Sequence, residues 1–310
     1  MSDESRPKAI VVGYDGSAEA RDALAAGLAL ARATSAPLVL AGAYGPDTVL
    51  SPDELEARGR EVGEQLRRAD RYLPSGLPFP VERIPLPGAS AAAALQKLAE
   101  DMHPRALVLG SCHRGMVGRV LAGSVAERLL NGSPCPVVVT PRGLAEREPA
   151  ELGTVCVGFD ARAEGWTALQ RAAQIASASG AQLRVVMVLP PLTGTPTMPL
   201  YPAEAVAERH RRAEIELDRA VRSVARRVEP VGRLLRGHPA QVLADQVNQD
   251  VDLLVVGSRG YGPLRRVLLG SVSTPLLRAA PCPVMVVPRT AEFQPIAEGM
   301  AAEDEFVSAG

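Results

Sequence analysis

The chain of 310 residues is an internal repeat of two copies that lie about 145 residues apart. The first copy starts at Ala9 with AIVVGYDGSAEARDAL, and the second starts at Thr154 with TVCVGFDARAEGWTAL. Near the end of each copy, SPCPVVVTPR from Ser133 matches APCPVMVVPR from Ala280. Each copy has the length of an ordinary domain, so the sequence predicts two domains of the same fold.

The ends of the repeat predict the domain bounds. We place the first domain at residues 1–142 and the second at residues 154–290. Between them, residues 143–153 are charged, rich in alanine and glutamate, and without apolar periodicity, which is typical of a linker. Residues 291–310 form an acidic C-terminal tail.

Each copy alternates apolar, β-branched runs with segments of helical periodicity. This alternation predicts an α/β fold, in which βα units build a parallel sheet covered by helices on both faces. Five runs in each copy are the expected strands: residues 9–14, 38–44, 81–86, 106–109 and 137–140, then 154–159, 183–189, 231–235, 253–256 and 284–287.

Capping residues mark the expected helix starts. Ser17 is predicted to cap the first helix. A longer helix is predicted to begin after Ser51, where Pro52 takes the first helical position and Glu54 completes a capping box. In the second copy, a long helix with an arginine-rich, solvated face is predicted over residues 203–228.

Composition excludes several classes of function. The 34 basic and 35 acidic residues leave a net charge of -1, and aromatic residues make up only 3%, so the chain lacks the basic surface and the stacking platforms of a nucleic-acid binder. It has no apolar run of membrane-spanning length and no signal-peptide pattern. We therefore expect no nucleic-acid partner, no membrane partner and a cytoplasmic location.

The cysteines are scattered and follow no known ligand spacing. Neither a C-x-x-C pair nor a Cys/His metal signature occurs, so the sequence predicts buried thiols and no metal centre. The four are Cys112, Cys135, Cys156 and Cys282.

Glycines cluster after the fourth expected strand of the second copy. Gly257 ends that strand, Gly260 follows in a loop, and Gly270 with Ser271 is expected to open a helix. Glycines let a backbone approach a phosphate closely, and the free N–H groups of a helix start favour an anion. Taken singly, these glycines could equally be tight turns and Ser271 an ordinary helix cap. Neither a P-loop nor a G-x-G-x-x-G fingerprint is present.

Together the spacings resemble one known family. Gly257, Gly260, Gly270 and Ser271 match G-x(2)-G-x(9)-G-[ST], the motif of ATP-binding universal stress proteins. The resemblance includes V-x-Y/F-D at each domain start and P-C-P-V at each end, and it covers about nine-tenths of the chain. It implies a five-stranded parallel sheet of order 3-2-1-4-5 in each domain, similar to the adenine nucleotide alpha hydrolases, and dimers that pair through the fifth strand.

The resemblance also implies which residues bind the nucleotide. In the second copy, the adenine and ribose side would be lined by Asp160 and Val188, and the ribose and phosphates would be held by Gly257, Arg259, Gly260, Gly270, Ser271, Val272 and Ser273. The counterparts in the first copy are Asp15, Ala43, Gly110, Gly123, Ser124 and Val125. No residue is assigned a catalytic role.

Each copy departs from the family pattern in its own way. In the first copy, His113 stands where the second loop glycine is expected, and Ala126 replaces the hydroxyl that Ser273 supplies. In the second copy, Ala-Arg at 161–162 replaces Gly-Ser at 16–17. The arginine there could reach a phosphate or lie on the surface. These differences predict that the second copy is the better nucleotide binder.

The resemblance points to a regulatory stress-response protein that binds ATP, with Mg2+ or Mn2+ as a candidate metal, and acts through an unidentified protein partner. A slow ATP hydrolase, a nucleotide-free dimerisation module and a flavin-binding relative remain as alternatives. We expect the strands at 137–140 and 284–287 to pair antiparallel as an internal pseudo-dimer, which would cover two sheet edges. Further pairing into a homodimer is left open.

Overall fold

The computed structural model describes residues 8–45, 51–112, 116–147, 151–192, 202–247, 250–258 and 270–288. The strands are β1 (Ile10–Gly13), β2 (Leu38–Tyr44), β3 (Val81–Pro87), β4 (Ala106–Leu109), β5 (Val137–Val139), β6 (Thr154–Phe159), β7 (Gln182–Leu189), β8 (Pro230–Arg236), β9 (Leu253–Gly257) and β10 (Val284–Val287). The helices are α1 (Ala18–Thr34), α2 (Pro52–Arg68), α3 (Ala91–Met102), α4 (Ser124–Leu130), α5 (Ala163–Ser179), α6 (Ala203–Val224), α7 (Pro239–Gln246) and α8 (Ser273–Ala279), with short 3-10 turns η2 (Ala69–Tyr72) and η3 (Leu144–Glu146). The strands fall within one or two residues of the predicted runs.

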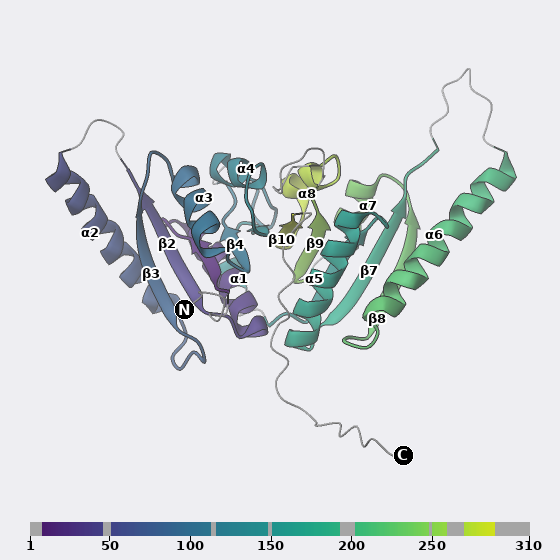
Figure 1. Cartoon of the computed structure of the whole chain (residues 1–310), viewed down its shortest axis with the longest axis horizontal. Helices are drawn as coiled ribbons and strands as arrows, with labels where there is room; N and C mark the ends of the chain where they lie inside the picture. The colour runs from purple at the N-terminus through teal and green to yellow at the C-terminus, as the bar shows by residue number, and fades with distance from the viewer. Residues whose placement is uncertain are drawn as a thin grey trace, which may run out of the picture.

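One sheet runs through both halves of the chain (Figure 1), in the order β3-β2-β1-β4-β5-β10-β9-β6-β7-β8. Neighbouring strands are parallel within each half. The halves join where β10 runs antiparallel to β5, with Val284 opposite Val139 and Val286 opposite Val137. The predicted α/β fold and the predicted antiparallel pairing are both confirmed, and neither β5 nor β10 is left as an open edge.

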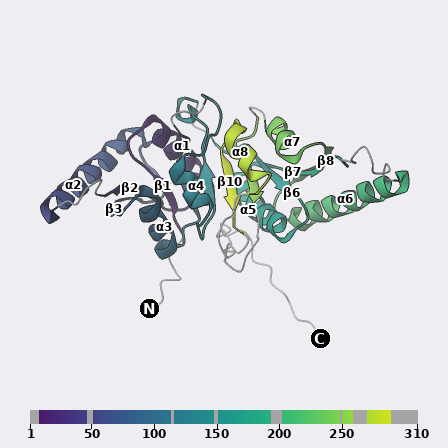
Figure 2. The same ribbon diagram turned by 90° about the horizontal axis from the view of Figure 1, so that it is seen from above.

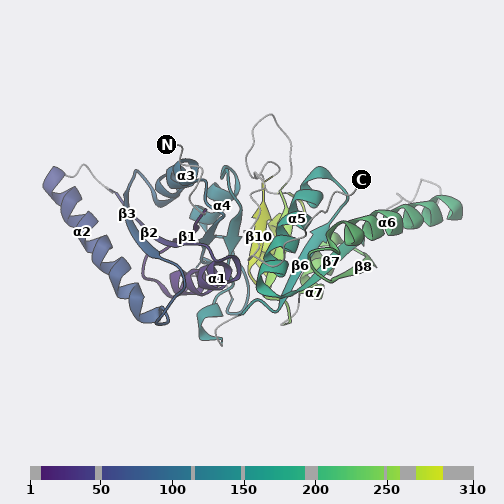
Figure 3. The same ribbon diagram turned by 60° about the horizontal axis from the view of Figure 1, so that its bottom comes forward.

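Helices cover both faces of the sheet because its strands are apolar on both sides. Ile10 and Val12 of β1 belong to the core under α1, α2, α5 and α6, whereas Val11 belongs to the core under α3, α4, α7 and α8. Each fully buried valine or leucine of this kind stabilises the fold by about 1.5 to 3 kcal/mol. Seen from above, α2 and α6 lie at the two far ends of the molecule (Figure 2). α1 packs against α5 near the centre, so one core is continuous between the halves (Figure 3).

The predicted capping residues act as expected. The Ser17 hydroxyl accepts a hydrogen bond from Ala20 N at 3.0 Å, and Ser51 forms a reciprocal capping box with Glu54. The long helix predicted over 203–228 is shorter, because the chain turns after Val224 and the N–H groups of Arg227 and Val228 bond back to its carbonyl.

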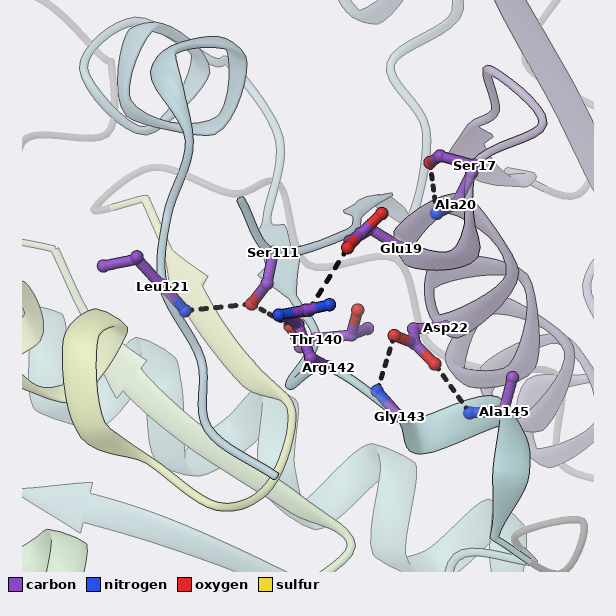
Figure 4. Close-up of polar contacts among 10 residues, drawn as sticks. All are labelled: Ser17, Glu19, Ala20, Asp22, Ser111, Leu121, Thr140, Arg142, Gly143 and Ala145. Carbon is purple, nitrogen blue, oxygen red and sulfur yellow. Dashed lines mark hydrogen bonds and ion pairs between the residues drawn. The ribbon is translucent and has the colours of Figure 1, made fainter. Parts of the chain in front are cut away.

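The first residues of the expected linker pack against α1. Gly143 N and Ala145 N donate to the two carboxylate oxygens of Asp22, at 2.8 and 2.7 Å, and η3 follows (Figure 4). Asp22 is buried, and burial raises the pKa of its carboxyl although these two N–H bonds act in the opposite direction. The start of the linker is therefore part of the first domain's packing.

Replacing Asp22 by alanine is expected to lower the free energy of unfolding by about 2 kcal/mol, because two N–H groups lose a charged acceptor. Urea denaturation measures the change. Thr167, which occupies the matching position of α5, is the control: its hydroxyl bonds only to Ala163 O of its own helix. We expect Thr167→Ala to change stability by less than about 0.5 kcal/mol. Equal effects of the two changes would contradict the proposed role of Asp22.

Candidate functional site

The expected site residues lie at the carboxyl ends of adjacent strands. In the first domain β2, β1 and β4 are neighbours, and in the second β7, β6 and β9 are neighbours. Strand order reverses between β1 and β4 and again between β6 and β9, which is where α/β sheets bind ligands. The topology therefore brings together Asp15, Ala43 and Gly110 in one domain and Asp160, Val188 and Gly257 in the other.

Each expected aspartate holds the turn that leads into the first helix of its domain. Asp15 Oδ1 accepts from Ser17 N at 3.0 Å, and Asp160 Oδ1 accepts from Arg162 N at 3.1 Å. The turn needs a left-handed residue, which is Gly16 at φ 79° in one copy and an alanine at position 161, φ 60°, in the other. The Asp160 side chain remains 58% exposed, so its second oxygen is accessible to a ligand.

Arg162 does not bind tightly to its own domain. Its guanidinium lies 4.0 Å from Asp160, and the arginine side chain is 72% exposed. Such an exposed pair contributes at most about 1 kcal/mol to stability. Ala43 and Val188, at the ends of β2 and β7, are half-buried and present small apolar surfaces at the same edge.

The glycines that end the fourth strands are required by packing. A Cβ on Gly110 would lie 2.6 Å from the carbonyl carbon of Glu19, and a Cβ on Gly257 would lie 2.8 Å from the carbonyl carbon of Glu164. Both contacts are with backbone in the first turn of the adjoining helix, which cannot move aside as a side chain can. These two residues thus have a structural role that is independent of any ligand.

Gly123 differs, because the fold does not require a glycine there. It caps α4 with φ −86°, and among the described residues the atom nearest to a Cβ there would be Cβ of Cys112 at 3.6 Å, an ordinary van der Waals distance. α4 begins at Ser124 as expected, and its first N–H groups are available as donors at this helix start. Glycine at this position leaves the space in front of them open, which suits the close approach of a phosphate.

The second copy corrects one expectation. Gly270 and Ser271 do not open the helix; α8 begins at Ser273. The Ser273 hydroxyl is 2% exposed and accepts a hydrogen bond from Gly270 N at 2.8 Å, while Thr274 Oγ1 donates to Gly270 O at 2.9 Å. This hydroxyl therefore holds a turn that precedes α8. Ser271 is exposed and Val272 half-buried. Arg259, Gly260 and His113 lie outside the described residues.

Sequence reasoning missed the serine that follows each strand-end glycine. The Ser111 hydroxyl donates to Thr140 O at 2.6 Å and accepts from Leu121 N at 2.9 Å, which ties the chain before α4 to the sheet (Figure 4). Its counterpart Ser258 is 2% exposed, and its hydroxyl has no hydrogen-bond partner among the described residues. The Gly-Ser pair repeated in both copies was the signal that could have identified these residues.

A separate cavity lies away from these strand ends. It measures ≈ 480 Å³ and is bounded by α1, residues 142–147 and the amino ends of β9 and β10. The Glu19–Arg142 ion pair, at 3.2 Å, and the Asp22 contacts lie along it (Figure 4). None of the residues assigned to nucleotide binding lines this cavity. Within the described ranges, no three His, Cys, Asp or Glu side chains could hold a metal ion, and no helix is long and apolar enough to span a bilayer.

Comparison with known proteins agrees with this architecture. The sequence model of the universal stress protein family matches residues 7–141 and 151–288. A universal stress protein of Mycobacterium tuberculosis is 32% identical over 208 residues, 64% of this chain and 69% of the relative. Another from the same species is 29% identical over 307 residues, 92% of this chain and 99% of the relative. A universal stress protein structure from Archaeoglobus fulgidus covers 91% of this chain and 98% of its own, with a TM-score of 0.63 and 20% identity, and shares the fold.

Proposed function

The chain belongs to the universal stress protein family, and on that premise we propose that it binds ATP as a regulatory module with little or no turnover. The observation that carries the proposal is Gly123. A glycine that packing does not require stands at a helix start, at the strand ends where sheets of this topology bind ligands. A residue with a larger side chain would fill the approach to the α4 N–H groups.

The roles of the residues follow from their chemistry. The carboxylates of Asp15 and Asp160 would accept hydrogen bonds from adenine or ribose, with Ala43 and Val188 against the base. The helix starts at Ser124 and at Ser271 to Ser273 would donate N–H bonds to phosphate oxygens. In the second domain, the unpartnered Ser258 hydroxyl is a further donor next to Gly257. Mg2+ or Mn2+, when present, would neutralise phosphate charge, and an attached protein partner would respond to nucleotide occupancy.

Turnover is expected to be negligible. At the described start of α4, the residues Gly123, Ser124 and Val125 offer N–H and hydroxyl donors but no side chain that could act as a base toward water. Acid extraction of the purified protein and chromatography of the supernatant should recover an adenine nucleotide. ATP hydrolysis should remain well below about 1 per second, the lower end of ordinary enzyme rates. Faster multiple turnover that is lost on Asp160→Asn would contradict the proposal and favour an ATP hydrolase.

A further inference from the structure

Two arginines lie together where the domains meet, Arg171 buried and Arg105 half-buried. Arg105 directly precedes β4 of the first domain, and Arg171 lies in the middle of α5 of the second. Both line one small cavity of ≈ 10 Å³, whose other walls are Thr34 and apolar side chains that include Ile10, Leu30 and Met285. Arg171 is 6% exposed.

In the described part of the chain, neither guanidinium group is paired with a carboxylate. Nε and Nη1 of Arg105 and Nε of Arg171 are buried without hydrogen-bond partners. No carboxylate among the described residues bonds to either arginine. A Cys135 thiolate could neutralise the charge of Arg171. The thiol stays uncharged near pH 7, however, because burial raises its pKa to about 11. Two like charges whose buried N–H groups have no acceptor are unfavourable.

The pKa values of the two arginines also reflect the unfavourable burial of positive charge. Burial lowers the pKa of Arg105, and burial together with the charge of Arg105 lowers that of Arg171 to about 10. A guanidinium does not lose its proton near pH 7, so both groups remain charged there. Loss of a proton therefore does not relieve the repulsion between the two positive charges. A negative charge between the two guanidinium groups would relieve it.

The repeat provides an internal comparison. At the position that matches Arg105, the second copy has Asp252, whose carboxylate accepts from Gly153 N and Thr154 N at 2.8 Å each. At the position that matches Arg171, α1 has Ala26, which lines the ≈ 480 Å³ cavity. The arginine pair is thus specific to one side of the junction and is not dictated by the shared fold.

We propose that Arg105 and Arg171 bind one small monatomic anion, chloride in ordinary salt, at the junction of the two domains. The cavity is small, ≈ 10 Å³, and therefore suits a monatomic anion better than phosphate, sulfate or a nucleotide. Water fits but supplies no charge. A chloride ion accepts N–H bonds from several directions, and it links the amino end of β4 to α5 of the other domain.

The test compares thermal unfolding of the full chain in sodium chloride and in sodium gluconate at equal ionic strength, since gluconate is too large to enter. We expect the unfolding temperature to be higher in chloride by about 2 to 4 °C. Arg171→Ala, which introduces the residue that α1 has at this position, should abolish the difference. Arg32→Ala, on an exposed arginine of α1, should preserve it.

Arg105→Gln is a second variant, for use if Arg171→Ala does not fold. It should also abolish the difference in unfolding temperature between chloride and gluconate. Anomalous scattering from bromide-soaked crystals should place the ion between the two guanidinium groups. Equal unfolding temperatures in the two salts, or a difference that survives both arginine changes, would overturn the proposal.

A further arm distinguishes free chloride from a carboxylate of the chain itself. The acidic side chains of residues 291–310 are changed to amides in the full chain: Glu292, Glu298, Glu303, Asp304 and Glu305. With free chloride as the ligand, this variant keeps the chloride effect of the wild type. If the effect appears only in this variant, a carboxylate of the chain is the native occupant, and the proposal of chloride in that place is overturned.

Discussion

Gly110→Ala is expected to lower the free energy of unfolding by about 2 to 4 kcal/mol. The new Cβ would lie 2.6 Å from the carbonyl carbon of Glu19, so the first turn of α1 would have to move away from the end of β4. Because α1 packs against both the sheet and α5, that movement loosens the first domain and the junction together. The midpoint of urea denaturation, measured at unchanged m-value, gives the loss.

Gly123→Ala is the matched control. Its Cβ has ordinary van der Waals room, so the loss comes only from alanine being a poorer helix cap than glycine, and we expect it to stay below about 1 kcal/mol. The two glycines thus separate packing from ligand binding. If Gly123→Ala destabilised the fold as much as Gly110→Ala, Gly123 would be a structural residue, and the argument from it for nucleotide binding would fail.

The architecture could be predicted because local signals agreed. The repeat gave the two similar halves, β-branched runs gave the strands, and Ser17 and Ser51 with Glu54 marked the helix starts. The antiparallel pairing of β5 with β10 followed from the resemblance together with the need to cover two edges.

The remainder depended on contacts between residues far apart in sequence. Asp22 is an ordinary helical carboxylate until Gly143 and Ala145 are placed against it. Arg171 reads as one more solvated arginine of an amphipathic helix, and only the fold brings it beside Arg105. The start of α8 was misplaced because the Ser273 hydroxyl bonds back to Gly270, and no spacing rule distinguishes this from a hydroxyl directed at a phosphate.

The hydrogen bond between Gly270 N and the Ser273 hydroxyl changes the reasons for expecting two unequal nucleotide sites. The prediction that the second domain binds ATP more tightly depended partly on Ser273, whose hydroxyl is already engaged in the turn before α8. Two reasons remain. The second copy has a glycine at position 260 where the first has a histidine at 113, and glycine takes up left-handed backbone more readily. In addition, Ser258 has an unpartnered hydroxyl where that of Ser111 is bonded twice.

Ser271→Glu and Ser124→Glu form a matched pair that tests this inequality, because both side chains are exposed and a carboxylate there should not disturb the core. Each change places a negative charge at the site proposed for phosphate in its own domain. We expect Ser271→Glu to weaken the tighter ATP site by tenfold or more, about 1.4 kcal/mol or above, and Ser124→Glu to leave that site unchanged. Isothermal titration of ATP into each variant measures both affinities, and Gly270→Glu and Gly123→Glu repeat the comparison one residue earlier. If the change in α4 removes the tighter site while Ser271→Glu spares it, the order of the two domains is reversed, and the Gly123 helix start is the main nucleotide site.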